Sequence, residues 1–395
     1  MGKEVDKRLI PEVNIGTLGH VDHGKSTLVE ALTGKWPAQH SEELKRGITI
    51  KLGYADATIY KCDGHFTTHA KCLQHGKECE PERTISFVDA PGHETLMATV
   101  LSAASLMDGV LFLIAANEKC PQPQTAEHLN VLNLIGQKKI VVVQSKVDLV
   151  SEERAIQSYK EIKEFLKGSV AENAPIIPVS AQMKVGIPEL IEAIEEIIPT
   201  PDRNNKLDTQ MLVVRSFDVN KPGSKIKDLK GGVVGGALLQ GFLKVGEKIE
   251  IRPGIKIKGQ YVPIVSKIVG LQKAGKDIEE AGPGGLLGVL TELDPSLTKA
   301  DSLAGSVAGI SGKMPAVIEK LTIKFSPIGK IEPIKLGEQV MISIGAARTV
   351  GVVKTIKKGN IEFELKLPVC SAGSRAVFSR FTGEGWKLIG WGEIH

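Results

Sequence analysis

The stretch Gly19–Ser26 reads GHVDHGKS. An apolar run at 13–18 precedes it and a helical pattern at 26–32 follows it, so the order is strand, glycine-rich loop, helix. This order is typical of a phosphate-binding loop, because glycines let backbone N–H groups wrap around a polyphosphate and the helix N-terminus faces its charge. Lys25 would then reach the terminal phosphates, and the Ser26 hydroxyl would bind Mg²⁺. The alternative is a glycine-rich turn that only caps a helix.

Length and composition indicate a protein of two or three domains. The chain has 395 residues, of which 42% are hydrophobic and 24% charged, and it contains no apolar run of about 18 residues that could span a membrane. The charged N-terminus is no signal peptide, and the odd number of cysteines, five, suits a reducing compartment. We therefore expect a cytoplasmic protein.

Net charge differs between the two halves. Lys plus Arg against Asp plus Glu count 21 and 27 over residues 1–200, which gives −6, but 29 and 19 over residues 201–395, which gives +10. A polyanionic partner such as a nucleic acid would bind the basic half, although dispersed surface lysines give the same count.

The first half alternates apolar strands with amphipathic helices, which predicts a parallel sheet covered on both faces, with ligands at the carboxyl ends of its strands. The expected strands are 13–18, 84–88, 109–115, 140–144 and 176–179, and the expected helices lie near 93–107, 124–135, 152–167 and 187–198.

A proline-rich linker at 199–205 ends this pattern. Short β-type runs divided by Gly and Pro turns follow it, which predicts β-barrels. Because two compact barrels fit the remaining length better than one, we place a boundary near Pro315. The β-type runs are 211–217, 247–251, 262–269, 317–325, 340–344, 350–356, 361–367 and 375–380.

Further motifs follow in the order that a GTPase requires. Asp89 directly follows a strand and would hold Mg²⁺ through a water, while the Gly92 N–H would meet the γ-phosphate. Thr49 would complete the Mg²⁺ shell only when the γ-phosphate is present, which makes its loop a switch.

The base site follows two later strands. The Asp148 carboxylate would accept both guanine N–H groups, the Lys146 stem would pack over the base, and backbone N–H groups at Ser180–Ala181 would approach the base carbonyl. Each of these residues alone could be an ordinary cap or turn residue, but their order along the chain makes coincidence an unlikely account.

The chain resembles the translational GTPases, and most closely the family of gamma subunits of archaeal and eukaryotic translation initiation factor 2. His20, Asp22 and His23 in the loop, RGITI at 46–50 and DAPGH at 89–93 mark the superfamily. More specific are AANE at 115–118 with PQPQT at 121–125, AENAPIIP at 171–178, RSFDVNKPG at 215–223 and LDPSLTKAD at 293–301.

This resemblance implies an α/β P-loop GTPase domain followed by two β-barrel domains. We place the GTP-binding domain at 1–202, with a zinc-knuckle insertion at 61–82, and the barrels at 203–314 and 315–395. The family implies a heterotrimer with alpha and beta subunits that carries methionyl initiator tRNA to the small ribosomal subunit, where GTP hydrolysis triggers release.

Site residues also follow from the resemblance. His93 would orient the attacking water, with Val21 and Ile48 as an apolar gate. The nucleotide would further contact a set of loop and base-site residues, namely His23, Gly24, Thr27, Ser145 and Gln182.

Asp22 would be repelled by the nucleotide unless a cation intervenes. It could therefore hold a second Mg²⁺ together with the Gly47 carbonyl, or point into solvent.

The chain departs from the family at two places. Ser145 replaces an asparagine of the guanine motif, and because serine is shorter and has one donor, we expect a looser tie between the base site and the phosphate loop. In the insertion, family members often carry two Cys-x-x-Cys pairs, whereas this chain has Cys62-x-x-His65 and Cys72-x-x-His75. Tetrahedral Zn²⁺ binding remains open, with Cys79 and His69 as competing ligands, and a metal-free loop is the alternative.

Two other functions share parts of this pattern. An elongator or selenocysteinyl-tRNA carrier shares the nucleotide motifs, although the run at 215–223 argues against it. The GTPase subunit of a sulfate adenylyltransferase is the rival from metabolism, and the basic second half disfavours it.

Replacing His93 by alanine tests the proposed water-positioning role. We expect GTP affinity to stay nearly unchanged and hydrolysis stimulated by a partner to fall, because the attacking water loses its orienting group. Nucleotide titration and single-turnover hydrolysis measure the two effects separately. A large loss of GTP affinity would contradict the assignment.

Overall fold

The computed structural model describes residues 6–37, 52–72, 75–90, 100–101, 104–204, 206–221, 223, 225–329, 331–357, 359–370, 375–383 and 385–394. The chain forms two compact units, Met1–Pro201 and Asp202–His395. Among the described residues, no helix is long and apolar enough to cross a membrane.

The first unit is an α/β domain. Its strands are β1 (Pro11–Gly19), β2 (Gly53–Cys62), β3 (His65–Thr67), β4 (Glu80–Asp89), β5 (Gly109–Ala115), β6 (Ile140–Ser145) and β7 (Ile176–Val179). Its helices are α1 (Lys25–Thr33), α4 (Pro123–Ile135), α5 (Glu152–Leu166) and α6 (Ile187–Ile197). Each strand expected from the sequence is present, whereas the expected helix near 93–107 lies largely outside the described residues.

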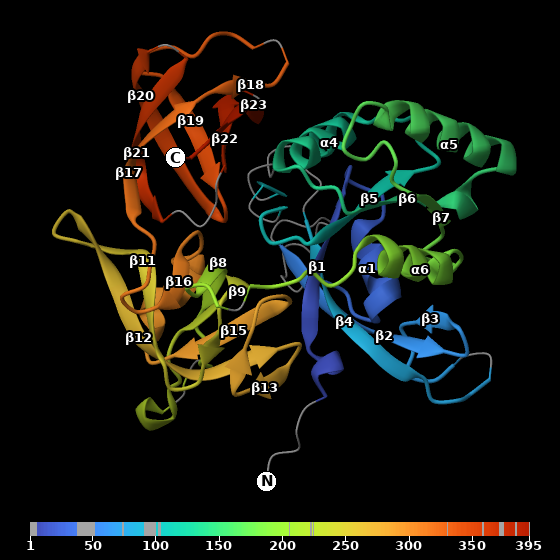
Figure 1. The fold of residues 1–395 in the computed structure, drawn as a ribbon, viewed down its shortest axis with the longest axis horizontal. Helices are drawn as coiled ribbons and strands as arrows, with labels where there is room; N and C mark the ends of the chain where they lie inside the picture. The colour runs from blue at the N-terminus through green and yellow to red at the C-terminus, as the bar shows by residue number, and fades with distance from the viewer. Residues whose placement is uncertain are drawn as a thin grey trace. The chain divides into compact units, whose positions relative to one another are not determined.

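One sheet in the order β3-β2-β4-β1-β5-β6-β7 forms the centre of this unit (Figure 1). The pairs from β4 to β7 are parallel, as the alternating pattern predicts. β2 and β3 are different, because β2 runs antiparallel to β4 and β3 antiparallel to β2. Since these two strands form hairpins around the insertion at 61–82, no crossover helix is needed there.

Helices cover both faces of the sheet (Figure 1). On one face, Leu28 and Leu32 of α1 and Ile194 of α6 pack in one core with alternate residues of β5 and β6, such as Leu113 and Val143. α4 and α5 lie on the other face (Figure 1). This arrangement leaves the carboxyl ends of the parallel strands free to carry loops.

The second unit begins with an antiparallel barrel. Its strands are β8 (Gln210–Phe217), β9 (Val233–Gln240), β10 (Leu243–Lys244), β11 (Lys248–Ile257), β12 (Gln260–Lys273), β13 (Lys276–Ile278), β14 (Glu280–Ala281), β15 (Leu286–Thr291) and β16 (Val307–Ile310). The sheet runs β11-β16-β8-β9-β15-β12-β13, and a further pairing between β11 and β12 closes six of these strands into a ring.

The last part of the chain is a curled antiparallel sheet, and within the described residues its first and last strands are not paired with each other. Its order is β17-β21-β20-β19-β22-β23-β18, with strands β17 (Val317–Lys324), β18 (Ser326–Pro327), β19 (Gln339–Ile344), β20 (Ala347–Lys357), β21 (Asn360–Cys370), β22 (Arg375–Phe381) and β23 (Trp386–Glu393). Phe378 lies in its core, stacked on Phe363 at 5.1 Å between ring centroids and edge-on to Phe325 at 5.7 Å.

Replacing Phe378 by alanine tests this aromatic core. Because the side chain is fully buried, its loss should destabilise the C-terminal sheet by about 3–5 kcal/mol. Phe381 on the same strand is 58% exposed, so Phe381→Ala is a matched control that should cost much less. Denaturation followed by the fluorescence of Trp386 and Trp391 in β23 measures both changes, and equal losses would contradict the assignment of the core.

Candidate nucleotide-binding site

The loop between β1 and α1 has the backbone shape of a phosphate cradle. Asp22 and Gly24 both take left-handed conformations, with φ of 63° and 86°, and Gly24 directly precedes α1. Gly19, with φ of 144°, lies so close to β5 that a Cβ would come 2.4 Å from the Leu113 carbonyl oxygen. Glycine is therefore required where the loop leaves the sheet.

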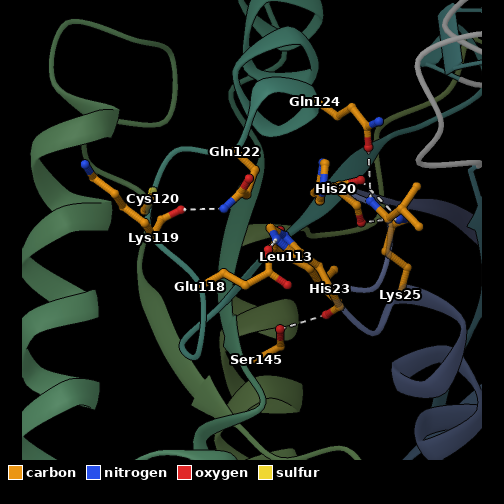
Figure 2. A network of polar contacts seen from close by, with 12 residues as sticks. His20, His23, Lys25, Leu113, Glu118, Lys119, Cys120, Gln122, Gln124 and Ser145 are labelled. Atoms are coloured by element: carbon orange, nitrogen blue, oxygen red, sulfur yellow. Dashed lines mark hydrogen bonds and ion pairs between the residues drawn. The ribbon is translucent and has the colours of Figure 1, made fainter.

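Lys25 is the buried cation of this loop. Its side chain is 6% exposed, and its Nζ donates hydrogen bonds to the carbonyl oxygens of Gly19 at 3.0 Å and His20 at 2.7 Å (Figure 2). Burial lowers the pKa of Lys25 from 10.5 to about 8, and the nearby carboxylates of Asp89 and Asp22 oppose this shift. An incoming polyphosphate would favour the charged form in the same way.

Ser26 and Asp89, which the sequence predicts to bind Mg²⁺, contact each other in the structure. The Ser26 hydroxyl donates to Asp89 Oδ2 at 2.6 Å, and the Thr17 hydroxyl donates to Asp89 Oδ1 at 2.7 Å. Thr17 and Asp89 are register partners in the parallel pair β1–β4. Serine hydroxyl and carboxylate oxygens are ligands that Mg²⁺ prefers, so the residues present fit this ion.

Two buried histidines connect the loop to β5 and α4 by hydrogen bonds. His23 Nδ1 donates to the Leu113 carbonyl oxygen at 2.9 Å, and its Nε2 lies 3.4 Å from Glu118 Oε2 (Figure 2). His128 of α4 accepts a hydrogen bond from the Gly19 N–H at 2.9 Å through Nδ1. Burial lowers the pKa of His23, and it lowers that of His128 to about 3, so the His128 ring is neutral near pH 7.

Three residues that support the loop were not predicted from the sequence. His128 and Gln124 come from α4, and Gln124 Oε1 accepts from the Val21 N–H at 3.3 Å (Figure 2). Glu118 follows β5. The motifs at 115–118 and 121–125 contain Glu118 and Gln124, but a lone His128 on an amphipathic helix carries no signal in the sequence.

The base-site residues lie at the ends of neighbouring strands. β6 ends at Ser145 and pairs in parallel with β7, where Ser145 is the register partner of Val179. Ser180, Ala181 and Gln182 follow β7 directly, as Lys146 follows β6. Asp148 is exposed, and its contact with the base stays a prediction.

Ser145 retains a direct tie to the phosphate loop. Its hydroxyl donates to the His23 carbonyl oxygen at 2.7 Å, and its side chain is buried (Figure 2). We expected the shorter side chain to loosen the connection between the base site and the phosphate loop. The single Ser145 hydroxyl nevertheless makes a hydrogen bond to that loop. The backbone carbonyl of Ser145 accepts from the Ala116 N–H at 2.8 Å, which also fixes the end of β6.

The remaining predicted residues divide into two groups. Val21, Gly24 and Thr27 are half-buried within or beside the loop, and Asp22 is exposed. Five predicted residues lie outside the described residues, namely Gly47, Ile48, Thr49, Gly92 and His93. Their roles stay predictions.

A second cluster of ligand-type side chains lies in the insertion. One nitrogen of His65 and the sulfurs of Cys62 and Cys72 all lie within 4.8 Å of one another. Cys62 and His65 are direct partners in the β2–β3 hairpin, whose turn residues Asp63 and Gly64 both have positive φ. Such a two-residue turn holds the flanking side chains opposite each other.

The cysteines of the insertion pack together. Cys62, Cys72 and Cys79 form one buried cluster, and hydrogen bonding with the Cys79 thiol is the first cause that raises the pKa of Cys62 to about 12. His75 is exposed, with Nδ1 3.4 Å from Cys72 Sγ.

Comparison with known proteins identifies the family. Residues 11–200 match the model of the elongation factor Tu GTP-binding domain, and residues 316–394 match the C-terminal domain of initiation factor eIF2 gamma. The gamma subunit of translation initiation factor 2 from Methanococcus maripaludis is 54% identical over 97% of this chain and 98% of its own length. The chain belongs to the gamma subunit family of translation initiation factor 2. The corresponding subunit from Methanocaldococcus jannaschii is 53% identical over 97% of both chains.

Family membership makes this chain a translational GTPase with a GTP-binding domain. Among solved structures, a bacterial selenocysteine-specific elongation factor matches with a TM-score of 0.76 and 25% identity over 98% of this chain. This chain spans only 58% of the length of that structure. Elongation factor SelB from Methanococcus maripaludis, solved with a GTP analogue, has a TM-score of 0.72 at 23% identity and supports the fold alone.

Replacing Lys25 by methionine tests two effects of this residue, its contribution to GTP binding and its effect on the stability of the nucleotide-free chain. Because the pKa of Lys25 is lower in the folded chain than in the unfolded chain, burial of the charge destabilises the nucleotide-free fold at pH 7. The shift from 10.5 to about 8 corresponds to up to about 3 kcal/mol. Lys25→Met should raise stability by up to this amount and abolish GTP binding.

The stability difference between Lys25→Met and the unmodified chain should depend on pH. The cost is fully present below pH 8 and fades as the pH rises toward 10.5, so the stability gain of the variant should fade over the same range. Thermal unfolding and GTP titration measure the two effects, with the exposed Lys35→Met as the control. Retained GTP affinity in Lys25→Met would refute the cradle.

Proposed function

We propose that this chain is the GTP-switched subunit that binds methionyl initiator tRNA and delivers it to the small ribosomal subunit. It would do so in the cytoplasm, in a heterotrimer with alpha and beta subunits. The observation that carries this proposal is the match to gamma subunits over nearly the full length of both chains. The basic second half of the sequence, at +10, supports a polyanionic partner such as tRNA.

The described residues support the chemistry at the phosphates. Lys25 holds the terminal phosphates, and Ser26 and Asp89 would hold Mg²⁺, which neutralises charge on the transferred phosphoryl group. Asp22 is exposed beside the loop, so together with the Gly47 carbonyl it could reach a second Mg²⁺ or remain in solvent. His93 would orient the attacking water, with Val21 and Ile48 on either side.

The switch would depend on two loop residues. Thr49 and Gly92 would hold their loops only while the γ-phosphate is present, so hydrolysis would release both loops and with them the tRNA. The sequence motifs that we assign to the nucleotide site include no evident arginine finger. We therefore expect slow intrinsic hydrolysis that a partner stimulates.

Guanine specificity would come from the ends of β6 and β7. Asp148 would accept the two guanine N–H groups, and Lys146, with φ of 59°, begins the tight turn that presents its side chain beside the base. The Ser180 N–H is already bonded to the Val185 carbonyl oxygen at 3.0 Å, so Ala181 and Gln182 are the better donors to the base carbonyl.

Zinc in the insertion is part of the proposal. Two buried thiols and one imidazole nitrogen, from Cys62, Cys72 and His65, supply donors that Zn²⁺ prefers. His75, the fourth ligand that the sequence favours, and Cys79 compete for the last position.

Selenocysteinyl-tRNA carriers are the main rivals because they share the fold. The initiation-factor match at 316–394 and the 54% identity to gamma subunits favour initiation instead.

Filter binding separates the rival functions. The full chain, alone and with alpha and beta subunits, is titrated with methionyl initiator tRNA and elongator methionyl-tRNA in the presence of a non-hydrolysable GTP analogue or GDP. We expect the initiator tRNA with the GTP analogue to bind at least about tenfold more tightly than any other combination, a difference of about 1.4 kcal/mol. Equal binding of both tRNAs, or no binding, would refute the proposed function.

A further inference from the structure

The insertion offers two candidates for the last metal-ligand position, and they differ in their surroundings. Cys79 is 9% exposed and belongs to the buried cluster with Cys62, at 4%, and Cys72, at 3%. His75 is exposed and lies in the turn that joins the two arms of the hairpin 70–79. A structural zinc site is closed, so a buried thiol suits it better than an exposed ring.

Backbone hydrogen bonds fix Cys79 beside Cys72. Lys71 and Glu78 form an antiparallel bridge, the Cys72 N–H donates to the Lys77 carbonyl oxygen at 2.8 Å, and the Cys79 N–H donates to the Ala70 carbonyl oxygen at 2.9 Å. Because side chains alternate along each arm, Cys72 and Cys79 project from the face opposite to Lys71 and Glu78. They are diagonal neighbours, a spacing that lets side chains on one face meet.

The same arrangement connects Cys79 with the first hairpin. Cys62 packs with Cys72 and Cys79 in one buried cluster, and Cys62 is the cross-strand partner of His65. Cys79 therefore belongs to the buried cluster, whereas the exposed His75 meets it through Cys72 Sγ, which lies 3.4 Å from His75 Nδ1.

We propose that Cys79, rather than His75, is the fourth zinc ligand, which gives a site of three cysteines and one histidine. The inference rests on the proposed binding of zinc. Tetrahedral Zn–S bonds of about 2.3 Å place two sulfurs about 3.8 Å apart. The donor atoms of Cys62, His65 and Cys72 lie within 4.8 Å of one another and need to close by about 1 Å, whereas Cys79 lies outside this group and would move farther from its place in the buried cluster. His75 then acts from outside the metal shell, donating from Nδ1 to the Cys72 sulfur and orienting it.

This assignment has a chemical consequence. Three thiolates and one neutral histidine around Zn²⁺ leave the site with a net charge of −1, whereas two of each leave it neutral. The exposed Lys71 on the same hairpin would offset part of that charge, whereas Lys77 already pairs with Asp63 at 3.4 Å. All four ligands would come from two hairpins that flank the entry to β4, so the metal would tie the insertion to the sheet.

Cobalt substitution counts the thiolates directly. The full chain and the variants Cys79→Ser, His75→Ala, Cys62→Ser and His69→Ala are loaded with Co²⁺, and the sulfur-to-cobalt charge-transfer band is measured per bound metal. We expect a three-thiolate intensity in the unmodified chain and in His75→Ala, and about two-thirds of it in Cys79→Ser. His69→Ala is the matched control, an exposed histidine of the same loop, and should change nothing.

Zinc affinity and thiol counts give an independent readout. Competition with a chromophoric chelator should show a loss of affinity of at least about 100-fold in Cys79→Ser and Cys62→Ser, and a smaller loss in His75→Ala. Zinc should protect three thiols of the insertion from a thiol reagent, whereas a site with His75 as the fourth ligand would protect two and leave Cys79 reactive. Retained binding of a GTP analogue shows that each variant folds.

The outcomes separate the two proposals. If the unmodified chain binds neither zinc nor cobalt, the zinc site itself is refuted. If metal binds, but Cys79→Ser keeps the spectrum and affinity of the unmodified chain while His75→Ala loses them, only the assignment of Cys79 is refuted.

Discussion

The parallel pairing of β1 with β4 is the constraint on which the nucleotide site depends. It places Thr17 opposite Asp89, so that the buried carboxylate is held by one hydroxyl from the same sheet and a second, Ser26, from the phosphate loop. A fully buried carboxylate is costly unless it is hydrogen-bonded, and here both oxygens have partners. The loop, the start of α1 and the end of β4 are therefore fixed together before any ligand binds.

The loop is also held from the side of β5 and α4. Gly19 donates to His128, His23 donates to Leu113, and Ser145 donates to the His23 carbonyl oxygen. Burial keeps the His128 ring neutral and lowers the pKa of His23, and Lys25 is the buried cation of the cradle. This is preorganisation for an anion, because the burial of Lys25 reduces stability until phosphate charge offsets it.

In the insertion, the pairing of two short hairpins, rather than a buried sheet, brings the candidate metal ligands together. A two-residue turn sets Cys62 against His65, and an antiparallel bridge sets Cys72 diagonally to Cys79. Two short hairpins bury too little apolar surface to be stable alone. A metal ion that binds side chains from both hairpins would stabilise their folded arrangement. The replacement of cysteine by histidine at 65 and 75 need not weaken such a site if a third thiol is already within reach.

The sequence by itself determined the strands of the parallel sheet, the order of the nucleotide motifs and their positions at strand ends, because apolar periodicity and loop chemistry are local properties. It did not predict the antiparallel β2 and β3, the support of Gly19 by His128, or the proximity of Cys79 to Cys62. Each of these depends on which segments pair, and 109 residues separate Gly19 from His128. Only the tertiary structure brings such partners together, since burial and strand register, rather than spacing along the chain, decide which side chains meet.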